Sequence, residues 1–560
     1  MSELVFESSS YRLELATDGL TVTLSSPGGL RCASLRPLAA LDTVAGPDET
    51  LEVLPPRRDG AKLTVERRST IWERASVTLD CADDALELRA SVSGRGELSD
   101  VHLLGFRSLL PRKPSGFMPS GSAFRTLFSP NPSDPRVLRP AAEACVIGVS
   151  GDGEPGRGHW LFTPAPLYLA LSVDDDEWVD LGLAGPVAEL GFVQLVYETR
   201  HGGFALRLEY EGHTRVDGDF EAPTLILTPG VRDPYAGLRR HRDDLVARNA
   251  APAPTSRETP AWWREPIFCG WGAQCHLAET THAGSAADRA TQASYDAFLS
   301  HLEREGVAPG TIVLDDKWQA AYGTNEPDRE KWSDLSGWIA ARHARGQKVL
   351  LWWKAWDPEG LSPELCVRNP DGVPVALDPT NPRAREALRE SIRAMLSTDG
   401  LDADGLKIDF TARTPSGRSL SAHGAGWGIA LLHDLLTVVY AAAKEAKADA
   451  LVMTHTPHPA FVDVTDMIRL NDMVSGAPSV VPQMRHRARV AQAACPELLI
   501  DTDDWRIPSL REWREYVEEK PLLGIPSLYY AHALDATSES FEPRDYEALR
   551  RTWAAWRAAT

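Results

Sequence analysis

The sequence lacks the marks of several large protein classes. Seven cysteines are scattered over 560 residues without a CxxC pair, which argues against a disulfide scaffold. No stretch approaches the roughly 18 apolar residues of a membrane span, and the first residues carry neither a basic segment nor the apolar run of a signal peptide. We therefore expect a soluble, cytoplasmic protein without a membrane partner.

An excess of positive charge is also missing. With 59 Lys and Arg against 79 Asp and Glu, the formal net charge is −20, which disfavours nucleic acid as a partner because phosphates are repelled. No GxGxxG or phosphate-loop pattern follows any strand predicted below, so no cofactor is expected. Neutral or cationic small molecules remain as partners, and the sequence leaves a homo-oligomer open.

The first part of the chain has the hydrophobic pattern of β-strands. Apolar and polar residues alternate over 11–24 and 191–212, each interrupted by a Gly-containing turn signal, which is typical of antiparallel strands with one buried face. This alternation therefore predicts an N-terminal β-sandwich over residues 1–235. Residues 236–260 combine a helical stretch with a Pro-rich segment, which predicts a linker between domains.

The hydrophobic pattern of the rest of the chain is different. Short apolar runs alternate with helix-period stretches over 261–560, which is typical of a (β/α)8 TIM barrel, and a doubly wound open sheet is the alternative. The predicted strands are 267–272, 311–316, 348–353, 405–410, 450–455, 467–472, 497–504 and 525–530. One helix is expected from about Ser285, with Ser285 and Asp288 as a capping pair, and another after the Asn381 cap.

Polar residues collect where these strands end. The groups there are Trp271, Asp315, Asp316, Trp318, Trp353, Lys354, Lys407, Asp409, His455, His458, Arg469, Asp472, Asp501, Asp503 and Asp504. The active site of a TIM barrel lies at this end of its strands. Paired carboxylates beside aromatic rings suit glycoside hydrolysis, which needs a nucleophile, a proton donor and platforms for a sugar. The pattern favours an enzyme acting on a small glycoside or an oligosaccharide.

Several of these strands also carry a family resemblance. The segments "IFCGWG", "TIVLDDKWQ", "GLKIDF" and "MIRLND", in this order, are similar to signatures of glycoside hydrolase family 36, the α-galactosidase family of clan D. The resemblance extends to its raffinose-synthase and seed-imbibition branch, which "LLIDTDDW" also resembles. It implies a retaining α-galactosidase.

The resemblance assigns two catalytic carboxylates. Asp409 matches the family's nucleophile, which forms a covalent glycosyl-enzyme, and Asp472 matches the acid/base. Asp501 is the reserve acid/base, but it belongs to the seventh strand, whereas the family's acid/base follows the sixth. Taken alone, Asp409 has an alternative as a structural partner of Lys407, and Asp472 has one as a helix cap.

The same resemblance implies binding roles. Asp315, Asp316 and Lys407 match residues that bind sugar hydroxyls, Trp271 and Trp318 match aromatic platforms, and Arg469 matches an arginine of the acid/base motif. We expect Trp353, Lys354, His455, Asp501 and Asp504 to line the same pocket, with core packing as the alternative for Trp353. Lys317 and Lys354 depart from the family pattern and are expected to alter the sugar subsite.

Three other functions fit parts of the pattern. An α-galactosyl transglycosylase would use the same residues and pass the sugar to an acceptor instead of water. A catalytically inactive sugar-binding barrel would keep the fold without the chemistry. A metal-dependent hydrolase is disfavoured, and no metal is expected, because His455 and His458 lack a third ligand and the run from Asp501 lacks the glycine of a calcium loop.

Overall fold

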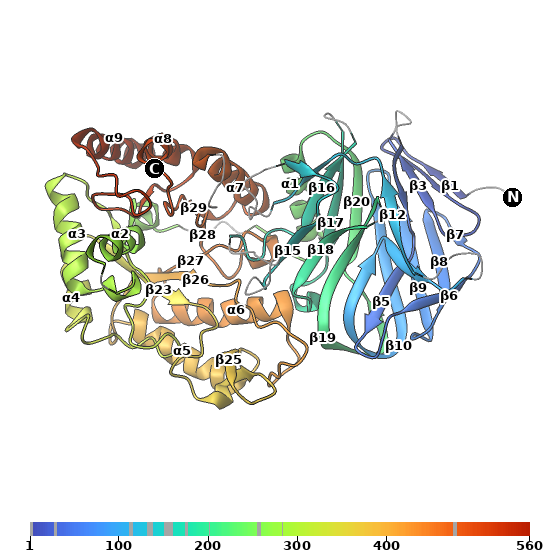
Figure 1. Cartoon of the computed structure of the whole chain (residues 1–560), viewed down its shortest axis with the longest axis horizontal. Helices are drawn as coiled ribbons and strands as arrows, with labels where there is room; N and C mark the ends of the chain where they lie inside the picture. The colour runs from blue at the N-terminus through green and yellow to red at the C-terminus, as the bar shows by residue number, and fades with distance from the viewer. Residues whose placement is uncertain are drawn as a thin grey trace.

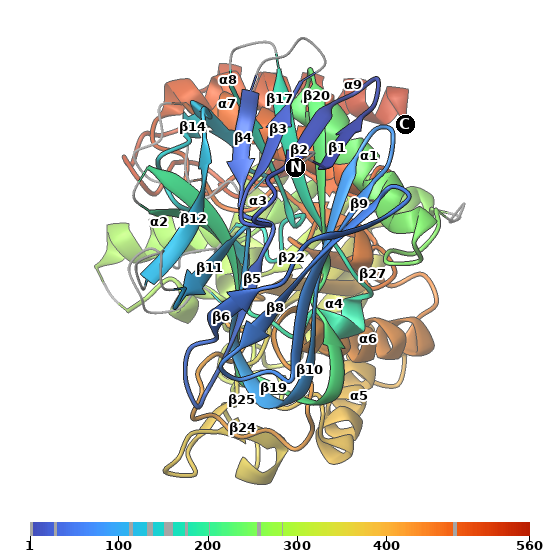
Figure 2. The same cartoon turned by 90° about the vertical axis from the view of Figure 1, so that its right-hand side faces the viewer.

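The chain has two halves of different architecture (Figure 1). The computed structural model describes residues 4–26, 31–110, 116–130, 138–150, 161–173, 177–200, 202–254, 259–282, 284–473 and 479–560. Strands dominate the first half, whereas strands and helices alternate in the second. In Figure 2 the β-rich half lies in front of the helical half.

Within the described ranges, twenty strands build the β-rich half. They are β1 (Leu4–Glu7), β2 (Arg12–Leu15), β3 (Val22–Ser25), β4 (Arg31–Leu35), β5 (Ala39–Thr43), β6 (Glu49–Val53), β7 (Arg57–Asp59), β8 (Lys62–Ser69), β9 (Arg74–Cys81), β10 (Leu86–Leu103), β11 (Gly105–Ser108), β12 (Gly116–Ser122), β13 (Thr126–Phe128), β14 (Leu138–Pro140), β15 (Cys145–Gly148), β16 (Tyr168–Ser172), β17 (Trp178–Ala184), β18 (Gln194–Arg200), β19 (Gly203–Glu221) and β20 (Thr224–Val231). They pair antiparallel, apart from the parallel pair of β6 and β11.

Alternation of side chains explains these strands. In β9 every second residue from Ala75 to Cys81 is buried, so one face of the strand covers a core and the other stays more open to solvent. The long strands β10 and β19 pair antiparallel from Ser91 opposite Glu221 onward. The prediction of a β-rich first half is confirmed.

Eight parallel strands form the sheet of the second half. They are β21 (Ile267–Cys269), β22 (Thr311–Leu314), β23 (Lys348–Lys354), β26 (Gly405–Asp409), β27 (Leu451–Thr454), β28 (Met467–Arg469), β29 (Leu499–Asp501) and β30 (Ser527–Leu528). Their order in the sheet is β29-β28-β27-β26-β23-β22-β21-β30. A parallel bridge between Asp501 and Ile525 links β29 to the residues before β30, so the sheet is barrel-like. Seven of them lie within the strands predicted from the sequence, and β23 runs one residue past its predicted end, to Lys354.

Helices surround these strands (Figure 1). They are α2 (Trp271–Thr281), α3 (Gln292–Arg304), α4 (Leu335–His343), α5 (Pro382–Leu396), α6 (Gly428–Ala446), α7 (Val480–Ala494), α8 (Leu510–Leu523) and α9 (Pro543–Ala559). A small hairpin, β24 (Cys366–Arg368) and β25 (Pro374–Leu377), projects before α5. As predicted, Asn381 caps α5, where its side chain accepts from the Arg383 N–H. None of the helices within the described ranges combines the length and apolar character of a membrane crossing.

One predicted helix start is wrong. The Ser285 and Asp288 pair does form, with Asp288 Oδ2 accepting from the Ser285 N–H at 2.7 Å. It closes a short 3-10 turn, and α3 begins only at Gln292, behind a Thr291 cap. The helix that buries Tyr295, Phe298 and Leu302 is therefore capped by Thr291, whose side chain accepts from the Ser294 N–H.

The connection between β27 and β28 also departs from a regular strand-helix alternation. All of its residues are described, and they form a 3-10 helix, Pro459–Phe461, without an α-helix. Pro457 and Pro459 explain this, because proline removes the backbone donors that an α-helix needs.

The two halves are joined by polar contacts around Glu211. Its carboxylate accepts from Trp427 Nε1 at 3.1 Å, from the Gly417 N–H at 2.8 Å and from the Ser416 hydroxyl at 2.6 Å. His213 stacks on Trp427 with 3.5 Å between ring centres. Strand β19 of the first half is thereby tied to the loop before α6.

The predicted linker begins with a packed helix. Helix α1 (Pro234–Ala247) is capped by Asp233 and buries Tyr235, Leu238 and Leu245. Residues at the start of 236–260 thus contribute to a core.

Candidate active site

Strand β26 brings two charged groups to one place. Lys407 and Asp409 lie two positions apart, so they share a face of the strand, while Ile408 is buried on the other face. In the parallel register with β23, Trp352 lies beside Lys407 and Lys354 beside Asp409. Three residues predicted near strand ends, Lys354, Lys407 and Asp409, therefore lie close together, with Trp352 beside them.

Arg469 connects the two predicted catalytic carboxylates. It ends β28 with 1% of its side chain exposed. Its Nη2 donates to Asp409 Oδ1 at 2.9 Å, and its Nη1 donates to Asp472 Oδ1 at 3.4 Å. Nη1 also donates to Asp503 Oδ2 at 2.8 Å. One buried guanidinium therefore holds three carboxylates at the ends of neighbouring strands.

The two carboxylates differ in their pKa. Burial by itself raises the pKa of Asp409, but the charge of Arg469, supported by His455, holds that pKa well below its usual range. Desolvation raises the pKa of Asp472 to about 7, although Arg469 opposes the shift. Both side chains remain reachable, with exposed fractions of 26% and 42%. The site can thus offer an ionised nucleophile beside a proton donor.

Lys407 belongs to a buried ion pair. Its Nζ donates to Asp315 Oδ2 at 2.6 Å, and Cys269 Sγ donates to the same oxygen at 3.0 Å. An unpaired charge at this depth would cost several kcal/mol, so the pair explains why strand β26 tolerates a lysine. The Asp315 N–H donates to the Tyr295 hydroxyl. These contacts hold Lys407 in place together with Asp315, and Lys407 lies two residues along the strand from Asp409.

Asp316 lies closer to solvent than Asp315. Its Oδ1 accepts from the Tyr322 hydroxyl at 2.8 Å. Burial raises the pKa of Asp316 to about 6, against the effect of that hydrogen bond. Tyr322 is a partly buried aromatic contact that sequence patterns did not single out.

The two unusual lysines gather around that tyrosine. Lys317 Nζ and Lys354 Nζ lie 3.8 and 3.9 Å from the centre of the Tyr322 ring. Lys354 pairs with Asp357 at 2.8 Å, and Lys317 pairs with Glu359 at 2.5 Å. Both lysines therefore lie near Asp316, and the charge of each is neutralised by a neighbouring carboxylate.

The acidic run after β29 is largely internal. Asp501 accepts from the Ser527 hydroxyl and the Asp503 N–H, and Asp504 accepts from Lys520 Nζ at 2.6 Å. Both Asp501 and Asp504 are buried, and burial raises the pKa of each to about 6. The pocket-lining roles of Asp501 and Asp504 stay predictions, and the carboxylates that Arg469 contacts are those of Asp409, Asp472 and Asp503.

The aromatic predictions divide in two. Trp271 begins α2, is partly exposed and meets Trp505 edge-on with 5.8 Å between ring centres. Trp318 was predicted as a platform, but it is fully buried, and its Nε1 donates to the Trp352 carbonyl at 2.8 Å. Trp353 is likewise buried, in line with its core alternative. A tryptophan whose N–H is satisfied by the backbone gains more from burial than from exposure.

Besides Tyr322, sequence reasoning also missed Trp352. Its Nε1 donates to Asp409 Oδ2 at 3.1 Å. Because side chains alternate along a strand, the residue facing the same side as Lys354 is Trp352 and not Trp353. That alternation was a signal available in the sequence.

His455 lies behind the carboxylates. Its Nε2 bonds the Thr411 hydroxyl at 2.6 Å, and its Nδ1 is 3.4 Å from Arg469 Nη2. Burial, assisted by the Arg469 charge, lowers its pKa to about 3. The Thr163 N–H donates to the His455 carbonyl at 3.0 Å, so a segment of the β-rich half reaches this site, which no local sequence pattern indicated.

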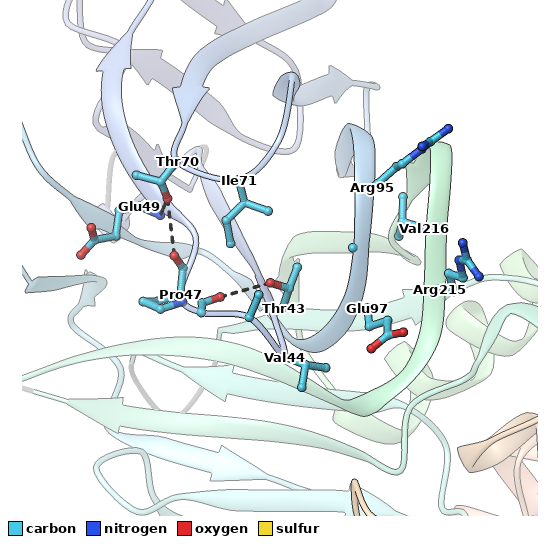
Figure 3. A pocket seen from close by; sticks show the side chains of 13 residues that line it. Thr43, Val44, Pro47, Glu49, Thr70, Ile71, Arg95, Glu97, Arg215 and Val216 are labelled. Atoms are coloured by element: carbon cyan, nitrogen blue, oxygen red, sulfur yellow. Dashed lines mark hydrogen bonds between the residues drawn. The ribbon is translucent and has the colours of Figure 1, made fainter. Parts of the chain in front are cut away.

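No group of three or more His, Cys, Asp or Glu side chains within the described ranges is arranged to hold a metal ion. A cavity of about 820 Å³ lies elsewhere, in the β-rich half, lined by Thr43, Thr70, Arg95 and Arg215 among others (Figure 3). The carboxylates of Glu49 and Glu97 lie on opposite sides of it (Figure 3). The paired carboxylates of the barrel-like sheet have no counterpart there.

The sequence matches no protein-family model and no curated protein. Solved structures do resemble its fold. A GH31 family sulfoquinovosidase from E. rectale, in complex with an aza-sugar inhibitor, has a TM-score of 0.60 at 12% identity, over 99% of this chain and 83% of that one. The α-galactosidase TtGalA from Thermus thermophilus, in complex with stachyose, has a TM-score of 0.53 at 17% identity, over 86% of this chain and 98% of that one.

A third similar structure is longer. The cycloalternan-forming enzyme from Listeria monocytogenes, in complex with a pentasaccharide substrate, has a TM-score of 0.55 at 10% identity, over 98% of this chain and 56% of that one. This chain therefore spans little more than half the length of that enzyme. At such identities the likeness concerns the fold, which this chain shares with solved glycoside hydrolases.

Proposed function

We propose that this chain is a retaining α-glycosidase acting on α-galactosides, with Asp409 as nucleophile and Asp472 as acid/base. The observation that carries the proposal is the contact of Arg469 with both carboxylates, one held ionised and the other with a pKa of about 7. A pair of carboxyl groups with separated pKa values is what glycoside hydrolysis requires. The proposal includes an N-terminal β-sandwich over 1–235 and a (β/α)8 barrel over 261–560.

The chemistry follows in two displacements. Asp409 attacks the anomeric carbon while Asp472 gives its proton to the departing glycosidic oxygen, which leaves a sugar ester on Asp409. Asp472, now ionised, takes a proton from water as that water attacks the same carbon and releases Asp409. Trp352, which donates to the second oxygen of Asp409, keeps the attacking carboxylate oriented. A transglycosylase differs only in the acceptor of the second step.

The choice of galactose rests on resemblance to family 36 and its signature strands. Similar solved structures include an α-galactosidase bound to stachyose and another complex of that enzyme with p-nitrophenyl α-D-galactopyranoside. Asp316 and Trp271 are the partly exposed groups available to a sugar hydroxyl and a sugar face.

The test compares hydrolysis of p-nitrophenyl α-galactoside and α-glucoside by wild type, Asp409→Asn and Asp371→Asn. Asp371 is an exposed loop residue and serves as a matched control. Turnover of the galactoside by wild type and by the control, lost in Asp409→Asn, is expected. Turnover of the glucoside alone would overturn the galactoside assignment, and binding without turnover of either would favour a sugar-binding protein.

A further inference from the structure

The loop that carries Asp472 is held by its backbone. It follows β28, and the Leu470 N–H donates to the Asp501 carbonyl at 2.9 Å. Asn471 adopts a left-handed conformation, with φ of 67°. The Met473 N–H donates to the Trp505 carbonyl at 2.7 Å. These bonds hold the backbone on either side of Asp472, and the carbonyls of residues 470–472 lie between them.

Those three carbonyls converge on one side chain. Nη1 of Arg487, on α7, shares its two N–H groups among the carbonyls of Leu470 at 2.9 Å, Asn471 at 2.7 Å and Asp472 at 2.6 Å. Arg487 is fully buried. It does not contact the Asp472 carboxyl in the described structure but reaches the backbone that carries it.

A purely structural role explains Arg487 poorly. Its Nε and Nη2 have no hydrogen-bond partner among the described residues. A buried guanidinium with donors left over is costly, and well-packed apolar side chains often replace buried charges without loss of stability. What Arg487 does provide is one point at which three successive carbonyls of the backbone that carries Asp472 are held.

We propose that Arg487 is a positioning residue for proton transfer by Asp472, acting through the backbone of residues 470–472. This inference rests on the proposed function, because it assumes that Asp472 is the acid/base. Arg487 lies on α7, outside every strand that carries the family resemblance. Loss of Arg487 should therefore slow the hydrolysis of substrates whose leaving group needs a proton, and should slow much less the hydrolysis of substrates whose leaving group needs none.

The proposal is tested by comparing the turnover of substrates with a poor and a good leaving group. Phenol is a poor leaving group and needs protonation, whereas dinitrophenolate leaves unassisted. For Arg487→Met we expect kcat/KM on phenyl α-galactoside to fall by about 100-fold, within the range that general acid catalysis supplies. On 2,4-dinitrophenyl α-galactoside the fall should stay within about 5-fold, because the donor is not needed there. Equal falls on both substrates would overturn the proposal.

Matched variants sharpen this comparison. Arg487→Lys keeps the charge and can still reach a carbonyl, so it should recover part of the loss on the phenyl substrate. Arg485→Met, on the same helix, removes an exposed arginine paired with Glu519 and should match wild type on both substrates. Thermal unfolding of each variant establishes that it is folded.

Hydrogen exchange tests the same proposal without substrate. In Arg487→Met, and to a smaller extent in Arg487→Lys, the peptide containing Leu470, Asn471 and Met473 should exchange faster than in wild type, while peptides of β9 are unchanged. Unchanged exchange in the loop would overturn the positioning role. If wild type turns over neither galactoside, the proposed function fails, and the exchange result still decides whether Arg487 holds the loop.

Discussion

The protonation of Asp472 should set the upper pH limit of activity. Its pKa of about 7 means that the carboxyl holds its proton below pH 7 and can donate it, and that donation fails as pH rises above that value. Asp409 stays ionised throughout, because its pKa lies below the usual range. We expect kcat/KM on phenyl α-galactoside to be highest in mildly acid solution and to fall above about pH 7.

Substitution identifies the group responsible. In Asp472→Asn the fall above pH 7 should disappear, and the rate on the phenyl substrate should drop by about 100-fold to 10,000-fold. Asp463→Asn, which removes an exposed carboxylate paired with His433, should keep the wild-type profile. Persistence of the high-pH limb in Asp472→Asn would assign it to another residue.

Sequence reasoning found the charged centre but not its aromatic neighbours. Asp409, Asp472 and Arg469 stand at strand ends, so their residue types and order sufficed to predict that they meet. The burial of Trp318 was not foreseen, because this residue lies beyond the end of β22, where no alternation of side chains indicates which residues face the core. Arg487 was missed because a long-range contact of a helix leaves no local pattern.

Strand β23 shows what an element contributes to one carboxylate. Its register beside β26 delivers the Trp352 N–H to Asp409 Oδ2 at 3.1 Å. Trp352→Phe removes that donor and keeps an aromatic ring, so the ionised form of Asp409 loses stabilisation. We expect kcat/KM to fall by about 10-fold, the equivalent of one hydrogen bond to a charged group, and its low-pH limb to move upward.

The control repeats the same chemical change elsewhere. Trp338 Nε1 donates to Asp296 Oδ1 at 2.8 Å, outside the site. Trp338→Phe should leave both the rate and the low-pH limb close to wild type. A similar fall in the two variants would mean that Trp352 acts through stability rather than through Asp409.

The elements themselves were more predictable than their ends. The eight parallel strands of the second half appeared in the sequence as mainly apolar runs, because a parallel strand buried on both faces carries few polar residues. The start of α3 and the 3-10 connection before β28 were not foreseen, since competing caps and proline pairs decide such boundaries locally.

At the scale of the whole molecule, the β-rich half helps to shape the site. Asn471 Nδ2 donates to the Leu161 carbonyl at 2.7 Å, and the hydroxyls of Thr163 and Thr411 are in contact. The residue beside the proposed acid/base is therefore held from the other half of the chain. Contacts of such sequence separation could not be predicted from local periodicity.

The junction around Glu211 should contribute measurably to stability. Glu211→Gln keeps the size of the side chain but removes the negative charge that strengthens the hydrogen bonds from the N–H groups of Gly417 and Trp427. We expect a loss of about 2 kcal/mol in the free energy of unfolding, the typical value of hydrogen bonds to a charged group. Chemical denaturation would measure it, with Glu221→Gln in an exposed strand end as control. Equal stability of both variants would contradict the role of this junction.

Capture of the glycosyl-enzyme tests the central claim most directly. Wild type and Asp409→Asn would be incubated with a fluorinated α-galactosyl fluoride that forms the intermediate faster than water removes it, followed by mass spectrometry of peptides. The predicted result is one sugar on Asp409 in wild type and none in the variant. A sugar on another residue, or turnover of the fluoride without any intermediate and with inversion at the anomeric carbon, would contradict Asp409 as the nucleophile of a retaining glycosidase.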